Sequence, residues 1–157
     1  CASVGEFEQG RTVLEGLRAA YPHCRFLVTF FSPSGYAARK AYPGADAVLY
    51  LPVDLPGAAQ AFLGIFQPRL ALFVKYEHWY GYLRALSRRG IPALLVSGAL
   101  RERSPWRGWL LRPLFKKMLG CYGQIFALNE AHAERFSAHT ALARVQAAGD
   151  TRFDRVA

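Results

Sequence analysis

Residues 70–80, LALFVKYEHWY, decide the fold, because a short unbroken apolar run is followed directly by a polar and aromatic cluster. An apolar run of this length is typical of a strand covered on both faces, and such strands occur in parallel sheets. Residues 93–96, ALLV, form a second run of the same kind. Helical patterns flank both runs. The alternation therefore predicts parallel strands joined by crossover helices, which is an α/β fold.

The same alternation extends along the whole chain. Periodicity predicts strands at 25–30, 47–50, 70–74, 93–97, 124–127 and 144–147, and helices at 6–20, 34–41, 56–66, 80–89, 110–119 and 130–138. Proline-containing segments at 21–22, 42–44, 67–68 and 90–92 stop the predicted helices before the next strand. The predicted fold class is α/β with a doubly wound parallel sheet, in a single domain over residues 1–157.

Composition narrows the class of protein and its partners. The chain has 157 residues, of which 52% are hydrophobic and 20% charged, so it is long and apolar enough to bury a core. A formal charge of +9 favours polyanionic partners such as nucleic acid, anionic lipid or phosphorylated substrates. The three cysteines and four histidines show no zinc-ligand spacing, and the phosphate-loop glycine motifs do not occur. We therefore predict no metal site.

The polar residues that follow the strands are the first candidates for chemistry, because parallel strands place their carboxyl ends at one edge of the sheet. Residues 3–6 are predicted to be a strand-to-helix junction that puts Glu6 in the first helical turn, where it either faces a ligand or interacts with the helix dipole. Ser32 and Ser34 begin a helix whose free amides either bind an anion or are capped by these serines.

The cluster after the central apolar run has two interpretations. Lys75, Glu77 and the rings around them suit a sugar-binding wall, since aromatic rings stack on sugars while charged groups bind hydroxyls. Alternatively, Trp79 and Tyr80 attach the next helix to the sheet, and the charged side chains remain solvated. For His78 we expect a surface or core position rather than a ligand role.

Residues 101–117, RERSPWRGWLLRPLFKK, mix basic, aromatic and aliphatic side chains, which favours contact with an anionic membrane. Pro113 breaks or starts a helix here, so two short pieces are expected. The alternatives are an ordinary amphipathic helix packed on the sheet, or a nucleic-acid contact. The predicted lipid-contacting residues are Arg101, Arg103, Trp106, Arg107, Trp109, Arg112, Lys116 and Lys117.

Four segments together resemble one known family. They are ASVGE at 2–6, TFFSPSGY at 29–36, FVKYE at 73–77 with Trp79, and GDTRFDRV at 149–156. In these segments the chain is similar to the amino-terminal domain of the 3-deoxy-D-manno-oct-2-ulosonic acid (Kdo) transferases of lipopolysaccharide assembly. The resemblance covers essentially the whole chain.

The resemblance implies the amino-terminal half of a GT-B-type glycosyltransferase with a Rossmann-like, acceptor-binding domain. It implies transfer of Kdo from CMP-Kdo, bound mainly by a carboxyl-terminal domain, onto a lipid A precursor. Glu6 falls on the family's catalytic base and Glu77 on a second active-site carboxylate, while His78 stands where the family more often has Phe. It also implies membrane association. The amino-terminal anchor, the first strand and the donor domain of the family are expected to be missing from these 157 residues.

Further expectations follow from these assignments. We expect Ser32, Ser34, Lys75 and Arg152 to bind the acceptor, with Lys75 and Arg152 neutralising substrate charge. No metal is needed, because CMP is a stabilised leaving group, and no cofactor is expected. The expected partners are the lipid A precursor, CMP-Kdo and the anionic surface of the inner membrane on its cytoplasmic face, and no nucleic acid. The alternatives are another GT-B-fold nucleotide-sugar enzyme such as an epimerase, or a non-enzymatic module that binds lipid or nucleic acid.

Overall fold

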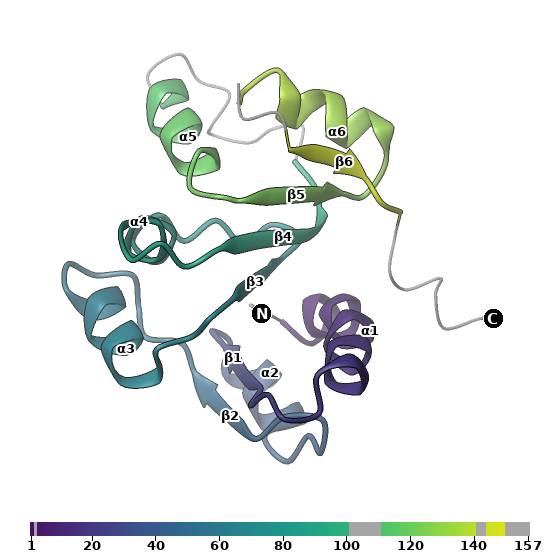
Figure 1. The fold of residues 1–157 in the computed structure, drawn as a ribbon, viewed down its shortest axis with the longest axis vertical. Helices are drawn as coiled ribbons and strands as arrows, with labels where there is room; N and C mark the ends of the chain where they lie inside the picture. The colour runs from purple at the N-terminus through teal and green to yellow at the C-terminus, as the bar shows by residue number, and fades with distance from the viewer. Residues whose placement is uncertain (2, 101–110, 141–143, 150–157) are drawn as a thin grey trace. The chain divides into compact units, whose positions relative to one another are not determined.

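Helices and strands alternate along the chain in the computed structural model, which describes residues 1, 3–100, 111–140 and 144–149 (Figure 1). The helices are α1 (Val4–Ala20), α2 (Pro33–Arg39), α3 (Ala58–Phe66), α4 (Tyr80–Arg88), α5 (Arg112–Leu119) and α6 (Glu130–Ser137). The strands are β1 (Leu27–Phe30), β2 (Ala47–Tyr50), β3 (Ala71–Val74), β4 (Ala93–Gly98), β5 (Gln124–Ala127) and β6 (Val145–Ala147). Each strand and helix that the sequence predicts is confirmed, and so is the α/β class.

The described strands pair in two separate parallel sheets, and the chain divides into two compact units. The first unit contains Cys1–Val53, and the second contains Asp54–Gly149. The assignment of a single domain to residues 1–157 stays a prediction.

In the first unit, β1 and β2 pair from Leu27 opposite Ala47 to Phe30 opposite Tyr50. The buried core of this unit consists of Phe7 from α1 with Val28 and Phe30 from β1. The rings of Phe7 and Phe30 lie 5.5 Å apart. These contacts attach α1 to the strand and thereby fix where the first turn of α1 lies.

In the second unit, the sheet has the strand order β3-β4-β5-β6, and neighbouring strands are parallel. The register between β4 and β5 shifts between Leu95 and Gly98. Leu95 and Ala93 of β4 have no exposed surface, which agrees with the apolar run that predicted a covered strand. Because the strands are parallel, the polar residues that follow β3 and β4 share the carboxyl edge of this sheet.

Candidate functional site

Glu6 lies in the first turn of α1 and closes a capping box with Ser3. Its Oε2 accepts hydrogen bonds from the Ser3 backbone N–H at 2.9 Å and from Ser3 Oγ at 3.1 Å. The Glu6 N–H in turn donates to Ser3 Oγ at 3.4 Å. Ser3 is extended and the helix begins at Val4, as the predicted strand-to-helix junction requires. The capping box fixes the carboxylate at the amino end of α1, and Oε1 takes part in neither of the two hydrogen bonds.

The first turn of α1 lies at the carboxyl edge of β1. The Cys1 backbone nitrogen donates to Thr29 O at 2.8 Å, and Phe31 N–H donates to Cys1 O at 3.1 Å. Cys1 therefore continues the parallel hydrogen-bonding pattern beside the end of β1. Glu6 and the residues that follow β1 consequently share one edge of the first unit.

Ser32 and Ser34 stand at that same edge, at the start of α2. Ser32 is the N-cap of this helix, and its Oγ accepts from Gly35 N–H at 3.0 Å. Ser34 Oγ lies 3.4 Å from Ser32 Oγ. Gly35 is required here, since a Cβ would lie 2.6 Å from the ring of Phe30. The capping alternative is confirmed for Ser32, and a role in acceptor binding stays a prediction for both serines.

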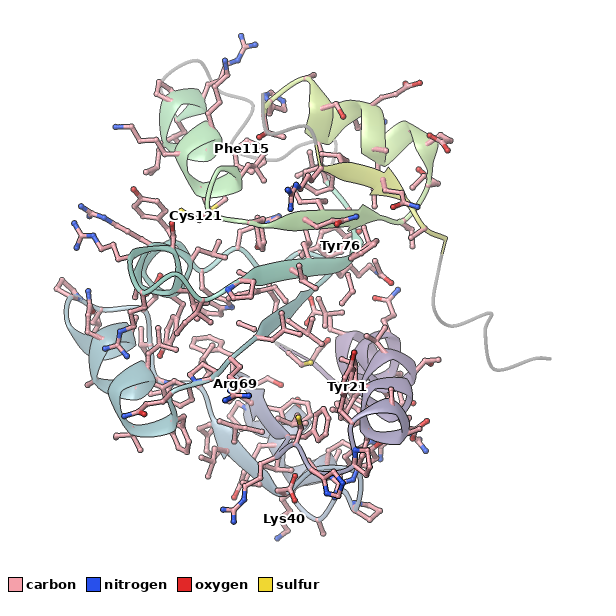
Figure 2. All side chains as sticks on the ribbon, viewed as in Figure 1. Tyr21, Lys40, Arg69, Tyr76, Phe115 and Cys121 are labelled. Carbon is pink, nitrogen blue, oxygen red and sulfur yellow. The ribbon has the colours of Figure 1, made fainter. Side chains whose placement is uncertain are left out.

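In the second unit, the β3–α4 loop (residues 75–79) is held by a left-handed residue. Lys75 has φ 61°, a conformation that costs a residue with a side chain roughly 1–3 kcal/mol. Its N–H donates to Val96 O at 3.0 Å, and its carbonyl accepts from Ala99 N–H at 3.3 Å. Lys75 Nζ lies 5.3 Å from the ring centre of Tyr76, which Figure 2 labels. The loop therefore leaves β3 on a defined path at the carboxyl edge.

Glu77 is buried in this loop, with 6% of its surface exposed. Its N–H donates to Val74 O at 3.3 Å, and its carbonyl accepts from Tyr122 Oη at 3.0 Å. Tyr122, which stands between α5 and β5 in the sequence, is buried with 5% of its surface exposed. Burial together with the nearby Glu77 carboxylate raises its pKa well above the ordinary value. Sequence reasoning missed Tyr122, because it stands 45 positions from Glu77 and belongs to no motif.

His78 packs among aromatic rings in the second unit. Its ring centre lies 6.1 Å from Phe115, 6.1 Å from Tyr122 and 6.3 Å from Phe136. His78 Nδ1 is 3.2 Å from Tyr122 Oη, and burial lowers the pKa of the imidazole to about 4. His78 is thus partly buried among these rings, between the core and the surface positions that were expected.

The turn after this loop is capped from a distant part of the chain. Trp79 is the N-cap of α4 and makes no side-chain cap, whereas Asp54 Oδ2 accepts from Gly81 N–H at 2.8 Å. A Cβ at Gly81 would overlap Asp54 Oδ1. Burial, together with the nearby carboxylate of Asp54, raises the pKa of Tyr82 to about 12. Asp54 therefore fixes the start of α4 beside the loop that carries Glu77.

Helix α5 divides into an apolar and a cationic side. Phe115, Met118 and Leu119 are buried, and Figure 2 labels Phe115 on this helix. Arg112, Lys116 and Lys117 are exposed. Pro113 stands in the first turn, which confirms that it starts a helix. The predicted lipid contacts Arg101, Arg103, Trp106, Arg107 and Trp109, and the predicted acceptor contact Arg152, lie outside the described residues.

The structure thus groups the candidate residues within each unit. Glu6, Ser32 and Ser34 share an edge of the first unit, and Lys75 and Glu77 share a loop of the second. Within residues 1, 3–100, 111–140 and 144–149, no three His, Cys, Asp or Glu residues gather as a metal site would require, and no helix there is both long and apolar enough to cross a bilayer.

Two solved structures are similar to this chain in fold. UDP-GlcNAc 2-epimerase from Neisseria meningitidis matches 98% of the chain and 46% of its own length, with a TM-score of 0.68 and 14% identity. A putative UDP-N-acetylglucosamine 2-epimerase from Listeria monocytogenes matches 90% of the chain and 43% of its own length, with a TM-score of 0.58 and 10% identity. At such low identity the likeness establishes the fold alone, and it supports the Rossmann-like class.

The family assignment rests on similarity in sequence to known proteins. A 3-deoxy-D-manno-octulosonic acid transferase of Haemophilus influenzae is 30% identical over 87% of the chain, and one of Chlamydia trachomatis serovar D is 29% identical over 86%. The chain spans about a third of either relative, 32% of each. The family model of the 3-deoxy-D-manno-octulosonic-acid transferases (Kdo transferases) matches residues 1–155. The chain therefore belongs to the Kdo transferase family of glycosyltransferases.

Proposed function

We propose that this chain is the acceptor-binding half of an enzyme that transfers Kdo from CMP-Kdo to a lipid A precursor. The donor is bound mainly by a further domain of the enzyme, and no cofactor takes part. The observation that supports this proposal best is the placement of Glu6. Its carboxylate is held in the first turn of α1, at the same edge of the first unit as Ser32.

In the proposed reaction, Glu6 acts as a general base toward the acceptor hydroxyl. The hydroxyl oxygen forms a bond to the anomeric carbon of Kdo, while the bond from that carbon to the phosphate oxygen of CMP breaks. The hydroxyl proton passes to Glu6, and CMP leaves with the electron pair. Attack opposite to the leaving group inverts the configuration. The two hydrogen bonds on Oε2 hold the carboxylate, so Oε1 serves as the proton acceptor.

The remaining candidate residues have supporting roles. Glu77 is the second active-site carboxylate, at the carboxyl edge of β3. Lys75, in the same loop, and Arg152 neutralise the charge of the substrates. Ser32 and Ser34 contact the acceptor beside α2. The rigid path of the loop supports a defined position for Glu77, since Lys75 is fixed on both sides by β4 and the residue that follows it.

Membrane contact belongs to the same proposal, because a lipid acceptor must be reached at a bilayer. Arg112, Lys116 and Lys117 present cationic groups on the exposed side of α5, while the apolar side chains of the helix are used in the core. Such a surface favours the phosphates of an anionic leaflet. We therefore place the protein at the cytoplasmic face of the inner membrane, with Arg101, Arg103, Trp106, Arg107 and Trp109 as further contacts.

Glu6→Gln tests the proposed base in a full-length enzyme that contains this chain. The amide oxygen of Gln can still accept from Ser3, so the helix cap persists while the basic oxygen is lost. Kdo transfer, measured with CMP-Kdo and a lipid A precursor, is expected to fall by about 10²–10⁴-fold. Glu8→Gln, two positions along the same helix, is the matched control and is expected to retain transfer. Near wild-type transfer by Glu6→Gln would eliminate the proposed base.

A further inference from the structure

A chain of hydrogen bonds runs from His78 to the main chain of Glu77 inside the second unit. His78 Nδ1 lies 3.2 Å from Tyr122 Oη, and Tyr122 Oη lies 3.0 Å from the carbonyl oxygen of Glu77. The second contact is buried. These two hydrogen bonds link the β3–α4 loop to the segment between α5 and β5, although Tyr122 stands 44 positions from His78 in the sequence.

The number of available protons decides which atom donates and which accepts in each of these two hydrogen bonds. A carbonyl oxygen only accepts, so the single hydroxyl proton of Tyr122 is donated to Glu77 O. Tyr122 Oη must then accept at its contact with His78, and Nδ1 of His78 must carry a proton. Burial disfavours a second proton on the ring. His78 is therefore the neutral tautomer with hydrogen on Nδ1, and Nε2 has no hydrogen-bond partner among the described residues.

These hydrogen bonds restrict the backbone at Glu77. The peptide before Glu77 is held by the hydrogen bond of its N–H to Val74 O, and the peptide after it by Tyr122. With both peptides fixed and the side chain 6% exposed, the carboxylate has little freedom to move. A phenylalanine at position 78 would have no ring nitrogen to orient the hydroxyl of Tyr122. In this protein the His78 N–H orients the hydroxyl of Tyr122.

We propose that Tyr122 and His78 are positioning residues that hold the Glu77 carboxylate in its working geometry, Tyr122 through the Glu77 carbonyl and His78 through Tyr122. This inference rests on the proposed role of Glu77 in transfer. Neither residue touches the substrates in the proposal. Small displacements of a catalytic group cost up to about 10²-fold in rate, so a support of this kind is expected to act on kcat.

The experiment measures kcat and KM for Kdo transfer in a full-length enzyme that contains this chain. Tyr122→Phe removes the donor to Glu77 O, and we expect kcat to fall at least about tenfold with KM changed less than about threefold. Tyr82→Phe is the matched control, because it removes the hydroxyl of another buried tyrosine, and we expect it to retain kcat. A kcat of Tyr122→Phe within twofold of wild type, measured on folded protein, would overturn the inference.

Two further variants test His78. In His78→Asn the amide N–H can take the place of the Nδ1 hydrogen, whereas His78→Phe offers no donor. We expect Asn to retain more of kcat than Phe, and equal losses would remove His78 from the inference. Nitrogen NMR of histidine-labelled protein gives a readout independent of activity. We expect the Nδ1–H tautomer in wild type, with the Nδ1 resonance shifted in Tyr122→Phe, and the Nε2–H tautomer would overturn the inference.

Glu77→Gln separates this inference from the proposed function. If Glu77→Gln leaves transfer unchanged, the active-site role of Glu77 fails, and the positioning role fails with it. The NMR experiment then tests only whether the hydrogen bonds among His78, Tyr122 and Glu77 are present. If Glu77→Gln reduces transfer and Tyr122→Phe does not, the positioning role fails while the proposed function stands.

Discussion

His78 is a titratable residue whose protonation the fold opposes, and this makes stability depend on pH. Its pKa is lowered from 6.5 to about 4 by burial. Between these values the unfolded chain binds a proton that the folded chain does not, so the free energy of unfolding falls as the pH drops from 6.5 towards 4. A shift of this size corresponds to a loss of about 3 kcal/mol, complete below the folded pKa.

Denaturant unfolding of the protein at a series of pH values measures how much unfolding free energy is lost through protonation of His78. His78→Phe is the reference, because it keeps an aromatic ring in the pocket and has no proton to bind. The difference in unfolding free energy between wild type and His78→Phe is expected to change by about 3 kcal/mol between neutral pH and pH about 4. A difference that stays constant over this range would show that the imidazole is not held neutral by burial.

The sequence allowed some of the site residues to be located and not others. Glu77 could be located because it follows an apolar strand, and Glu6 because it opens a helical pattern after a short polar segment. Tyr122 could not, because its contact with Glu77 depends on the packing of β3 and β5 on opposite sides of β4. A buried tyrosine hydroxyl leaves no pattern in the local sequence that names its partner.

At the level of secondary structure, the start of α4 depends on a close fit between Asp54 and Gly81. The Asp54 carboxylate accepts from Gly81 N–H at 2.8 Å, and there is no room for a Cβ between them. Gly81→Ala is therefore expected to displace Asp54 and to cost the helix its cap, about 0.5–2 kcal/mol of unfolding free energy. The measurement is denaturant unfolding of the variant and the wild type under the same conditions.

A double-mutant cycle isolates this fit from the helix propensity of alanine. In an Asp54→Ala background the clash is absent, so Gly81→Ala is expected to stabilise the protein by up to about 1 kcal/mol, because Ala favours helix over Gly. The same substitution thus has opposite signs in the two backgrounds. If Gly81→Ala has the same effect with and without Asp54, the carboxylate does not restrict position 81.

The ends of the elements show where local patterns were insufficient. The apolar runs and proline segments located the strands, because these features depend only on neighbouring residues. Helix α3 begins at Ala58 rather than at Pro56, since Gly57 adopts φ 86° as its N-cap. Helix α1 begins at Val4 rather than at Glu6, because Ser3 caps it and Glu6 becomes its third residue. Cap geometry therefore decides positions that hydrophobic periodicity leaves open.

For the whole molecule, the pairing of strands was less predictable than their positions. The sequence predicted a parallel sheet, and the described strands are parallel but pair as β1-β2 and as β3-β4-β5-β6. Which strand pairs with which depends on contacts between distant residues, such as Leu27 with Ala47 and Ala71 with Ala93. Periodicity gives the type of each element, and long-range packing decides its neighbours.

The charge of the whole molecule is uneven along its sequence. The formal charge is +9, and the sequences of α3, α4 and α5 contain no Asp or Glu. On α5 the basic side chains are exposed and the apolar ones are buried. The proposed binding of this helix to a membrane is therefore expected to be mainly electrostatic, with a contribution of about 1 kcal/mol for each basic residue near an anionic surface.

Charge reversal on α5 tests this contact. Lys116→Glu with Lys117→Glu is expected to weaken co-sedimentation of the protein with anionic vesicles by at least about tenfold, because two attractive charges become repulsive. Arg25→Glu with Lys40→Glu is the matched control: both residues are exposed, both lie in the first unit, and the net charge changes equally.

Neutral vesicles and duplex DNA complete the comparison. Equal losses in both double variants would mean that binding follows net charge rather than α5, and preferential binding to DNA would contradict the membrane contact. A loss confined to the α5 variant, and to vesicles that carry anionic lipid, is the expected result, because screened charges act over only about 8 Å at physiological salt.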